Sequence, residues 1–165
     1  MALYAVGAEA MSARLEAVAI SGAEGRATMV RVPLDPARRK ELMAILEPLF
    51  TSPAATVVSH DIKRDMILLR REGIDLIAPY FDTSLAHYVL QPEMRHRLAD
   101  VAMQVLHYQT ADYSDAPASR KTVVSLPDEL LTARLCEQAD ICRRMMEPLE
   151  QLLADNGQLQ LLRDV

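Results

Sequence analysis

The chain has 165 residues, of which 50% are hydrophobic and 25% charged, and its formal net charge at pH 7 is -5. This length and hydrophobic content predict one buried core and a single domain over residues 1–165, and they exclude the disordered and fibrous classes. The negative net charge argues against tight DNA binding by the chain alone, because nonspecific affinity for DNA comes mainly from Lys and Arg side chains that contact phosphates.

Membrane and disulfide signals are missing from the sequence. No apolar run approaches the roughly 18 to 20 residues that a membrane-spanning helix needs, and no signal-peptide pattern opens the chain. The two cysteines, Cys136 and Cys142, fit neither a CxxC redox pair nor a zinc knuckle. We therefore expect free thiols, a cytoplasmic location and no membrane partner.

The first half of the chain predicts strands followed by a helix. Ala2 to Val6, Leu15 to Ser21 and Ala27 to Val32 are short apolar segments separated by glycines, and they are expected to form three strands. Asp35 followed by Pro36 is a helix-start signal, because the carboxylate can cap the first turn and proline lacks only an N–H that would be unpaired there.

The middle of the chain alternates between strand and helix patterns. Ala55 to Ser59 predicts a buried strand, and the helix after it is expected to end at Gly73. The Pro79-Tyr80-Phe81 segment is interpreted as a turn. A helix is expected from Asp82 or Thr83 to about Leu90, and another carries the apolar face that begins at Leu98.

The last third of the chain is predicted to be mainly helical. Residues Thr110 to Lys121 are expected to form a surface loop, and Pro127 to about Asn156 a long helix that Pro148 bends or divides. A further helix is expected to start near Leu159. Strands first, then alternating elements, then helices predict an α/β fold with a mixed central sheet flanked by helices.

Three ordered motifs carry a resemblance to a known family. They are Ser59 to Asp65 (S-H-D-I-K-R-D), Phe81 to Pro92 (F-D-T-S-L-A-H-Y-V-L-Q-P) and Arg95 to Leu98 (R-H-R-L). These segments resemble the 3'-5' exonuclease, or proofreading, domain of bacterial DNA polymerase I, a family A DNA polymerase. The family motifs are G-Q-N-x-K-Y-D, F-D-T-x-L-A-x-Y-L-L-x-P and R-H-x-L. The resemblance implies a DnaQ-like, RNase H-like fold.

The active members of that family use two divalent metal ions, Mg²⁺ or Mn²⁺. Such chemistry needs several carboxylates converging on two cations about 3.5 to 4 Å apart. The family supplies them from a D-x-E pair on the first strand, the aspartate of the second motif, and a Y-x-x-x-D element on the last long helix.

Most of these family positions hold other residues in this chain. The D-x-E pair falls on Ala2 and Tyr4, and the tyrosine and aspartate of the last element fall on Arg134 and Gln138. Only Asp65 keeps a liganding carboxylate. The altered positions are also more positive, which disfavours divalent cations. No metal cofactor and no catalytic residue are therefore expected.

Other acids do not restore the metal set. Glu137 and Asp140 match family acids that are not the principal ligands, so they are residual acids only. The acids among the first 34 residues are Glu9, Glu16 and Glu24, and none has an aspartate two positions earlier.

The retained polar residues also have plain structural interpretations. Asp65 is expected at the start of a helix as a dipole or capping carboxylate, and Asp82 as an N-cap. The four histidines show neither HxH nor HxxxH zinc spacing and are expected to be surface or hydrogen-bonded residues: His60, His87, His96 and His107.

The sequence thus predicts a degenerate, catalytically inactive exonuclease-like domain excised from a bacterial DNA polymerase I. Its expected partner is a covalently linked polymerase domain, which it would support in DNA replication and repair, with DNA bound through the parent enzyme and weakly by the fragment. One alternative is an active exonuclease with a rearranged two-metal site built from Asp65, Glu137, Asp140 and Glu9. Another is a stand-alone binding module on the same scaffold.

Overall fold

The computed structural model describes residues 1–7, 9–111 and 127–164. Its first three strands form an antiparallel sheet in the order β1 (Ala2–Val6), β2 (Arg14–Ala23) and β3 (Arg26–Arg31). These strands confirm the three predicted from the sequence. Glycine at position 25 has a φ of 67° in the β2–β3 turn, a backbone conformation that costs glycine little.

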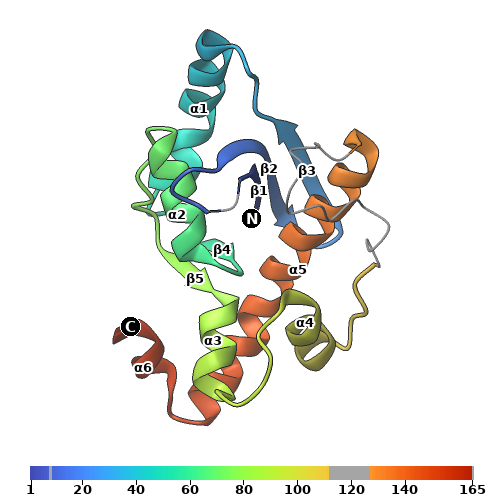
Figure 1. Ribbon diagram of the computed structural model, residues 1–165. Helices are drawn as coiled ribbons and strands as arrows, with labels where there is room; N and C mark the ends of the chain where they lie inside the picture. The colour runs from blue at the N-terminus through green and yellow to red at the C-terminus, as the bar shows by residue number, and fades with distance from the viewer. Residues whose placement is uncertain (8, 112–126, 165) are drawn as a thin grey trace.

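A second pair of strands forms a separate two-stranded sheet beside the first. β4 (Val57–Ser59) and β5 (Tyr80–Asp82) pair in parallel. The Met1 nitrogen donates to the carbonyl oxygen of Val58 at 2.7 Å, which joins the start of β1 to β4. The predicted mixed sheet flanked by helices is therefore confirmed (Figure 1).

Helices cover the strands on both sides. Figure 1 shows α1 and α2 beside one another on one side of the strands, with α5 passing along the other. None of the described helices is long and apolar enough to cross a membrane. The helices are α1 (Pro36–Thr51), α2 (Ile62–Arg71), α3 (Thr83–Leu90), α4 (Leu98–Leu106), α5 (Asp128–Asp155) and α6 (Leu159–Asp164).

The core follows the alternation of side chains along β2. Ala17 and Ala19 pack against Leu135 and Ala139 of α5, whereas Val18 faces the cluster that α1 and α2 share with the sheet. Small alanines on the α5 side allow this helix to lie close to the sheet. A third apolar cluster joins the second half of α5 to α3 and α4.

One expectation about local structure was wrong, and of the two outcomes expected at Pro148, a bend or a division of the helix, the division is excluded. The segment around Tyr80 is not a turn, because residues 80–82 pair with β4 as strand β5. Helix α5 is not divided at Pro148, since helix continues to Asp155. The missing proline N–H removes one bond, and the burial of Met145, Leu149 and Leu153 holds the helix on both sides of it. The predicted loop from Thr110 to Lys121 lies mostly outside the described residues.

Candidate functional site

Asp65 lies in the first turn of α2 and is buried. The Ser59 hydroxyl, at the end of β4, donates a short hydrogen bond to its carboxylate, and the Arg64 guanidinium lies 3.4 Å away. The N-cap of the helix is Asp61, whose carboxylate accepts from the Arg64 amide at 3.2 Å. Asp65 is therefore not the capping residue that the sequence suggested, although it does lie near the positive end of the helix dipole.

Burial dominates the acidity of this carboxyl group. It raises the pKa of Asp65 from 3.8 to about 6, because the charged form loses its hydration. The hydrogen bond from Ser59 and the charge of Arg64 oppose the shift and are smaller.

A small cavity brings together three of the positions that the sequence singled out. Ala2 on β1, Asp65 on α2 and Gln138 on α5 line a cavity of about 150 Å³, and the buried thiol of Cys142 lies beside them. Burial raises the pKa of this thiol to about 11. The fold thus places side chains from β1, α2 and α5 at one point, as the alignment of the motifs implied.

The other two altered positions lie away from this cavity. Tyr4 is on the same face of β1 as Ala2, and it packs against the apolar cluster that contains Leu131 and Leu135 of α5. Arg134 lies one helical turn before Gln138 and does not line the cavity. Its side chain has no hydrogen bond or ion pair to the part of the chain that the structure describes.

The residual acids of α5 are engaged elsewhere. Glu137 accepts hydrogen bonds from the Tyr108 hydroxyl at 3.0 Å and the Ala111 amide at 2.9 Å. Asp140 accepts from Ser21 at 3.2 Å and from the Gly25 amide at 3.0 Å, which fastens the β2–β3 hairpin to the helix. Neither acid lines the cavity that holds Asp65, and exposed Glu9 does not line it either.

The residues at the cavity do not fit a pair of divalent metal ions. Hard cations prefer several oxygen ligands, mainly carboxylates, and the lining offers two acids, Asp65 and Asp61, of which Asp61 caps a helix. A methyl group stands at position 2 and a neutral amide at position 138. Among the described residues, no group of three or more His, Cys, Asp or Glu side chains has a geometry that could hold a metal.

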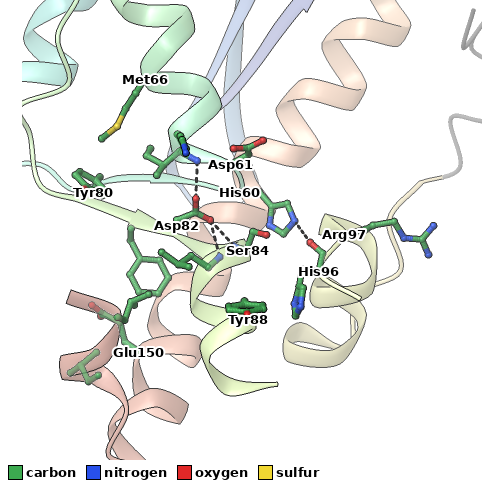
Figure 2. A pocket seen from close by; sticks show the side chains of 16 residues that line it. His60, Asp61, Met66, Tyr80, Asp82, Ser84, Tyr88, His96, Arg97 and Glu150 are labelled. Atoms are coloured by element: carbon green, nitrogen blue, oxygen red, sulfur yellow. Dashed lines mark hydrogen bonds between the residues drawn. The ribbon is translucent and has the colours of Figure 1, made fainter. Parts of the chain in front are cut away.

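A larger groove of about 1120 Å³ adjoins the cavity, and His60 and Asp61 line both spaces (Figure 2). All three motifs that carry the family resemblance contribute to it, together with apolar side chains from α6. Tyr80 and Tyr88, on its wall, are both more than half exposed. The groove therefore lies where the ends of β4 and β5 meet the starts of α2 and α3.

Several polar side chains in the groove have hydrogen-bond or ion-pair partners within the protein. The Asp82 carboxylate accepts from the amides of Ile62, Ser84 and Leu85 at 2.9, 2.8 and 3.1 Å, which confirms its predicted role as an N-cap (Figure 2). It also joins the start of α2 to the start of α3. Arg97 pairs with Asp100 at 2.7 Å.

Two histidines form a contact that spacing in the sequence did not reveal. The Nδ1 atoms of His87 and His96 are 2.8 Å apart, and the other nitrogen of buried His87 lies 2.7 Å from the Gln104 side-chain oxygen. His60 contacts Thr83 at 2.8 Å and the His96 carbonyl oxygen at 2.7 Å. Burial lowers the pKa of His60, which favours the neutral ring. These histidines hold the segment before α4 against α3.

The strand order, the position of α5 and the place of β4 are those of the RNase H-like fold. The family model for the 3'-5' exonuclease of family A DNA polymerases matches residues 5–139, and the chain belongs to this family. The match begins one residue after Tyr4, so the assignment of Ala2 and Tyr4 to the family's D-x-E pair is a prediction.

Curated relatives agree with this family. The chain is 35% identical over 109 residues to DNA polymerase I of Streptococcus pneumoniae serotype 4, and 34% identical over 107 residues to that of Bacillus subtilis. Each alignment covers 64% of this chain and 12% of the relative. The match to DNA polymerase I of Treponema pallidum covers 79% of this chain at 27% identity and 13% of that relative. The chain thus spans a small part of each.

Solved structures share the fold. Brucella melitensis NrnC superposes with a TM-score of 0.76 at 20% identity, covering 98% of this chain and 75% of that chain. The POL domain of Pol1 from M. smegmatis, in complex with DNA primer-template and dNTP, gives a TM-score of 0.70 at 24% identity. That alignment covers 97% of this chain and 25% of the other. At these identities the likeness concerns the fold alone.

Proposed function

We propose that this chain is a catalytically inactive 3'-5' exonuclease-like domain of a bacterial DNA polymerase I, which supports the polymerase in DNA replication and repair. One observation carries the proposal: the cavity where β1, α2 and α5 meet holds Ala2, Asp65 and Gln138. Two-metal hydrolysis needs several carboxylates at such a meeting point, and of these three residues only Asp65 is an acid.

The charges of the adjoining groove favour a supporting role for the domain and disfavour the binding of DNA phosphates there. Lys63 is the one basic lining residue without an ion pair among the described residues, since Arg97 pairs with Asp100. Asp61, Asp82 and Glu150 line the same groove. A strand of phosphates would meet more negative than positive side chains there, so DNA is expected to be bound mainly through the parent enzyme.

Titration calorimetry with Mn²⁺, with and without a short single strand carrying a 3'-hydroxyl, tests the loss of catalysis when run beside a gel assay for strand shortening. We expect neither two-site metal binding nor shortening. Mn²⁺-stimulated loss of 3'-terminal nucleotides that disappears in Asp65→Ala would contradict the proposal and favour a rearranged site.

The supporting role needs a separate measurement in the parent polypeptide. Removing residues 1–165 is expected to lower the melting temperature of the polymerase domain, whereas Asp65→Asn is expected to leave polymerase activity unchanged. A polymerase domain that melts identically with and without this domain would contradict the supporting role. The alternative of a stand-alone binding module predicts a native reading frame with no polymerase sequence.

A further inference from the structure

Residues 92–97, between α3 and α4, have one side chain that is not exposed, which is that of His96. The His96 ring lies against the rings of His87 and Tyr88 of α3, with centroids 5.0 and 5.4 Å away. Its backbone carbonyl oxygen accepts from the His60 ring at 2.7 Å. The segment therefore depends on His96 for its attachment to α3, and His96 and Arg97 line the groove from this side (Figure 2).

The contact between His87 and His96 has room for one proton. Their Nδ1 atoms are 2.8 Å apart, so one nitrogen donates its proton and the other accepts it with its lone pair. The Gln104 amide nitrogen donates to the Gln91 side-chain oxygen, which turns the Gln104 oxygen toward the second ring nitrogen of His87, at 2.7 Å. That nitrogen must carry a proton to donate to an oxygen. His87 therefore accepts at Nδ1, and His96 donates.

This arrangement determines what each added proton does. A first proton can bind at the Nε2 atom of His96, on the side of the groove, and it strengthens the contact because the donor ring becomes charged. A second proton can bind only at the Nδ1 atom of His87, where it would face the proton of His96. Two N–H groups cannot hydrogen-bond to each other, so the second proton breaks the contact.

His60, in the same network, does not have this limit. Its Nε2 atom donates to the His96 carbonyl, and its Nδ1 atom lies 2.8 Å from the Thr83 hydroxyl. A hydroxyl group both donates and accepts, so Thr83 can donate to the neutral ring. When Nδ1 gains a proton, the hydroxyl can instead accept from it and donate to the Ser59 carbonyl, at 3.2 Å. Protonation of His60 thus keeps both contacts, unlike protonation of His87.

We propose that His87 and His96 form a latch, which one proton tightens and a second proton releases, so that residues 92–97 separate from α3. An unperturbed imidazole titrates near about pH 6.5, so the second proton binds below that value. Release moves His96 and Arg97 away from Tyr88 and widens the groove. The latch does not depend on whether the domain is a nuclease, since neither histidine lines the Asp65 cavity.

Charged and titratable groups of both signs face the pair from the neighbouring elements. They are His60 and Asp61 after β4, Asp82 before α3, and Arg95, Arg97 and Asp100 before and within α4. The part of α5 that packs on α3 adds apolar side chains and the Cys142 thiol, which stays protonated because burial raises its pKa to about 11. The acids and arginines largely offset one another, so the one-proton limit of the contact governs its response to pH.

Nuclear magnetic resonance of the 165-residue chain between pH 7.5 and 5 tests the latch. Ring nitrogen shifts count the protons on each histidine, and contacts between the ring protons of Tyr88 and His96 report attachment. Exchange of the Met94 amide, compared with an unfolded peptide at the same pH, reports release. We expect attachment down to about pH 6 and then about a tenfold loss of protection per pH unit, since one proton separates the two states. Amides of the β1–β2 ladder should stay protected.

The variant His96→Asn separates the effect of the proton from that of the fold. An asparagine amide can donate to a neutral His87 or accept from a charged one, so we expect residues 92–97 to stay attached at pH 5. His107→Asn is the matched control. His107 is exposed and has a φ of 52°, a left-handed conformation that asparagine tolerates, so this variant should release the segment as the unmodified chain does.

Three results would overturn the proposal. The first is a contact between Tyr88 and His96 that persists when both rings of the pair are charged. The second is attachment at pH 5 with a single proton on the pair. The third is release of residues 92–97 in His96→Asn at the same pH as in the unmodified chain, or only together with loss of protection in the β1–β2 ladder. The ring measurements on the unmodified chain decide the first two even if the variant does not fold.

Discussion

Residues 59–98 match the family motifs, whereas the family acids expected on β1 and the first half of α5 are predicted to fall on Ala2 and Gln138, and the two regions meet at the Asp65 cavity. The retained residues mostly bind backbone. Asp82 accepts three amide hydrogen bonds, and His60 joins Thr83 to the segment before α4. Ala2 and Gln138 line the cavity without making any such backbone contact. Under the proposed function, the residues that serve the fold are the ones that match the family, and those that would serve catalysis alone are the ones that differ.

Placing acids at Ala2 and Gln138 should create a metal-binding site at the Asp65 cavity. In Ala2→Asp/Gln138→Asp, two new carboxylates would join Asp65 and the capping Asp61 at the cavity, and we expect Mn²⁺ binding with a Kd of about 1 mM or tighter, equivalent to ~4 kcal/mol or more. Titration calorimetry measures this. The same double variant with Asp65→Asn is the control and should bind far more weakly. A double variant without metal binding would show that these positions do not converge as described.

Removing a retained acid should damage the fold. Asp82→Ala leaves the amides of Ile62, Ser84 and Leu85 without their acceptor at the starts of two helices, and we expect a loss of about 3 to 4 kcal/mol in the free energy of unfolding. Urea denaturation measures it. Asp35→Ala, at an exposed cap with one amide partner, should cost about 1 kcal/mol. Equal losses in the two variants would argue against the joining role of Asp82.

The pH dependence of stability should reveal Asp65 directly. Its pKa is about 6 in the folded chain and 3.8 when exposed, so between these values the folded state binds more protons than the unfolded state. The contribution of Asp65 to the free energy of unfolding should therefore fall by about 3 kcal/mol as the pH rises through this window.

Comparison with Asp65→Asn isolates this contribution, since the variant does not titrate at the site. Urea denaturation of both proteins at several pH values gives the difference in unfolding free energy, which should change only between about pH 4 and 6. A constant difference across this range would mean that the carboxyl is ionised in the folded chain as readily as in the unfolded one.

Much of this structure was predictable from local sequence patterns. The Asp35-Pro36 start of α1 and the Asp82 cap of α3 were predicted correctly, because caps act within one helical turn. Strand β5 was missed, since Pro79 and Tyr80 resemble a turn and only pairing with β4 makes a strand of them. The continuity of α5 through Pro148 likewise depends on packing partners distant in sequence.

The candidate site, too, was predicted only in part from the sequence. The motifs identified Ala2, Asp65 and Gln138, and the fold brings them together at one cavity. The partner of Asp65, the Ser59 hydroxyl, and the contact between His87 and His96 were not predicted, because neither follows a known spacing.

The two hydrogen bonds that Asp140 accepts from Ser21 and Gly25 have a consequence for how related sequences are compared. An aspartate at this position has a structural role, because it attaches the β2–β3 hairpin to α5, whether or not the domain is a nuclease. We therefore expect an acid at this position in active and inactive members of the family alike. Relatives that are nucleases and relatives that are scaffolds should instead differ at the residues equivalent to Ala2 and Gln138, which line the Asp65 cavity.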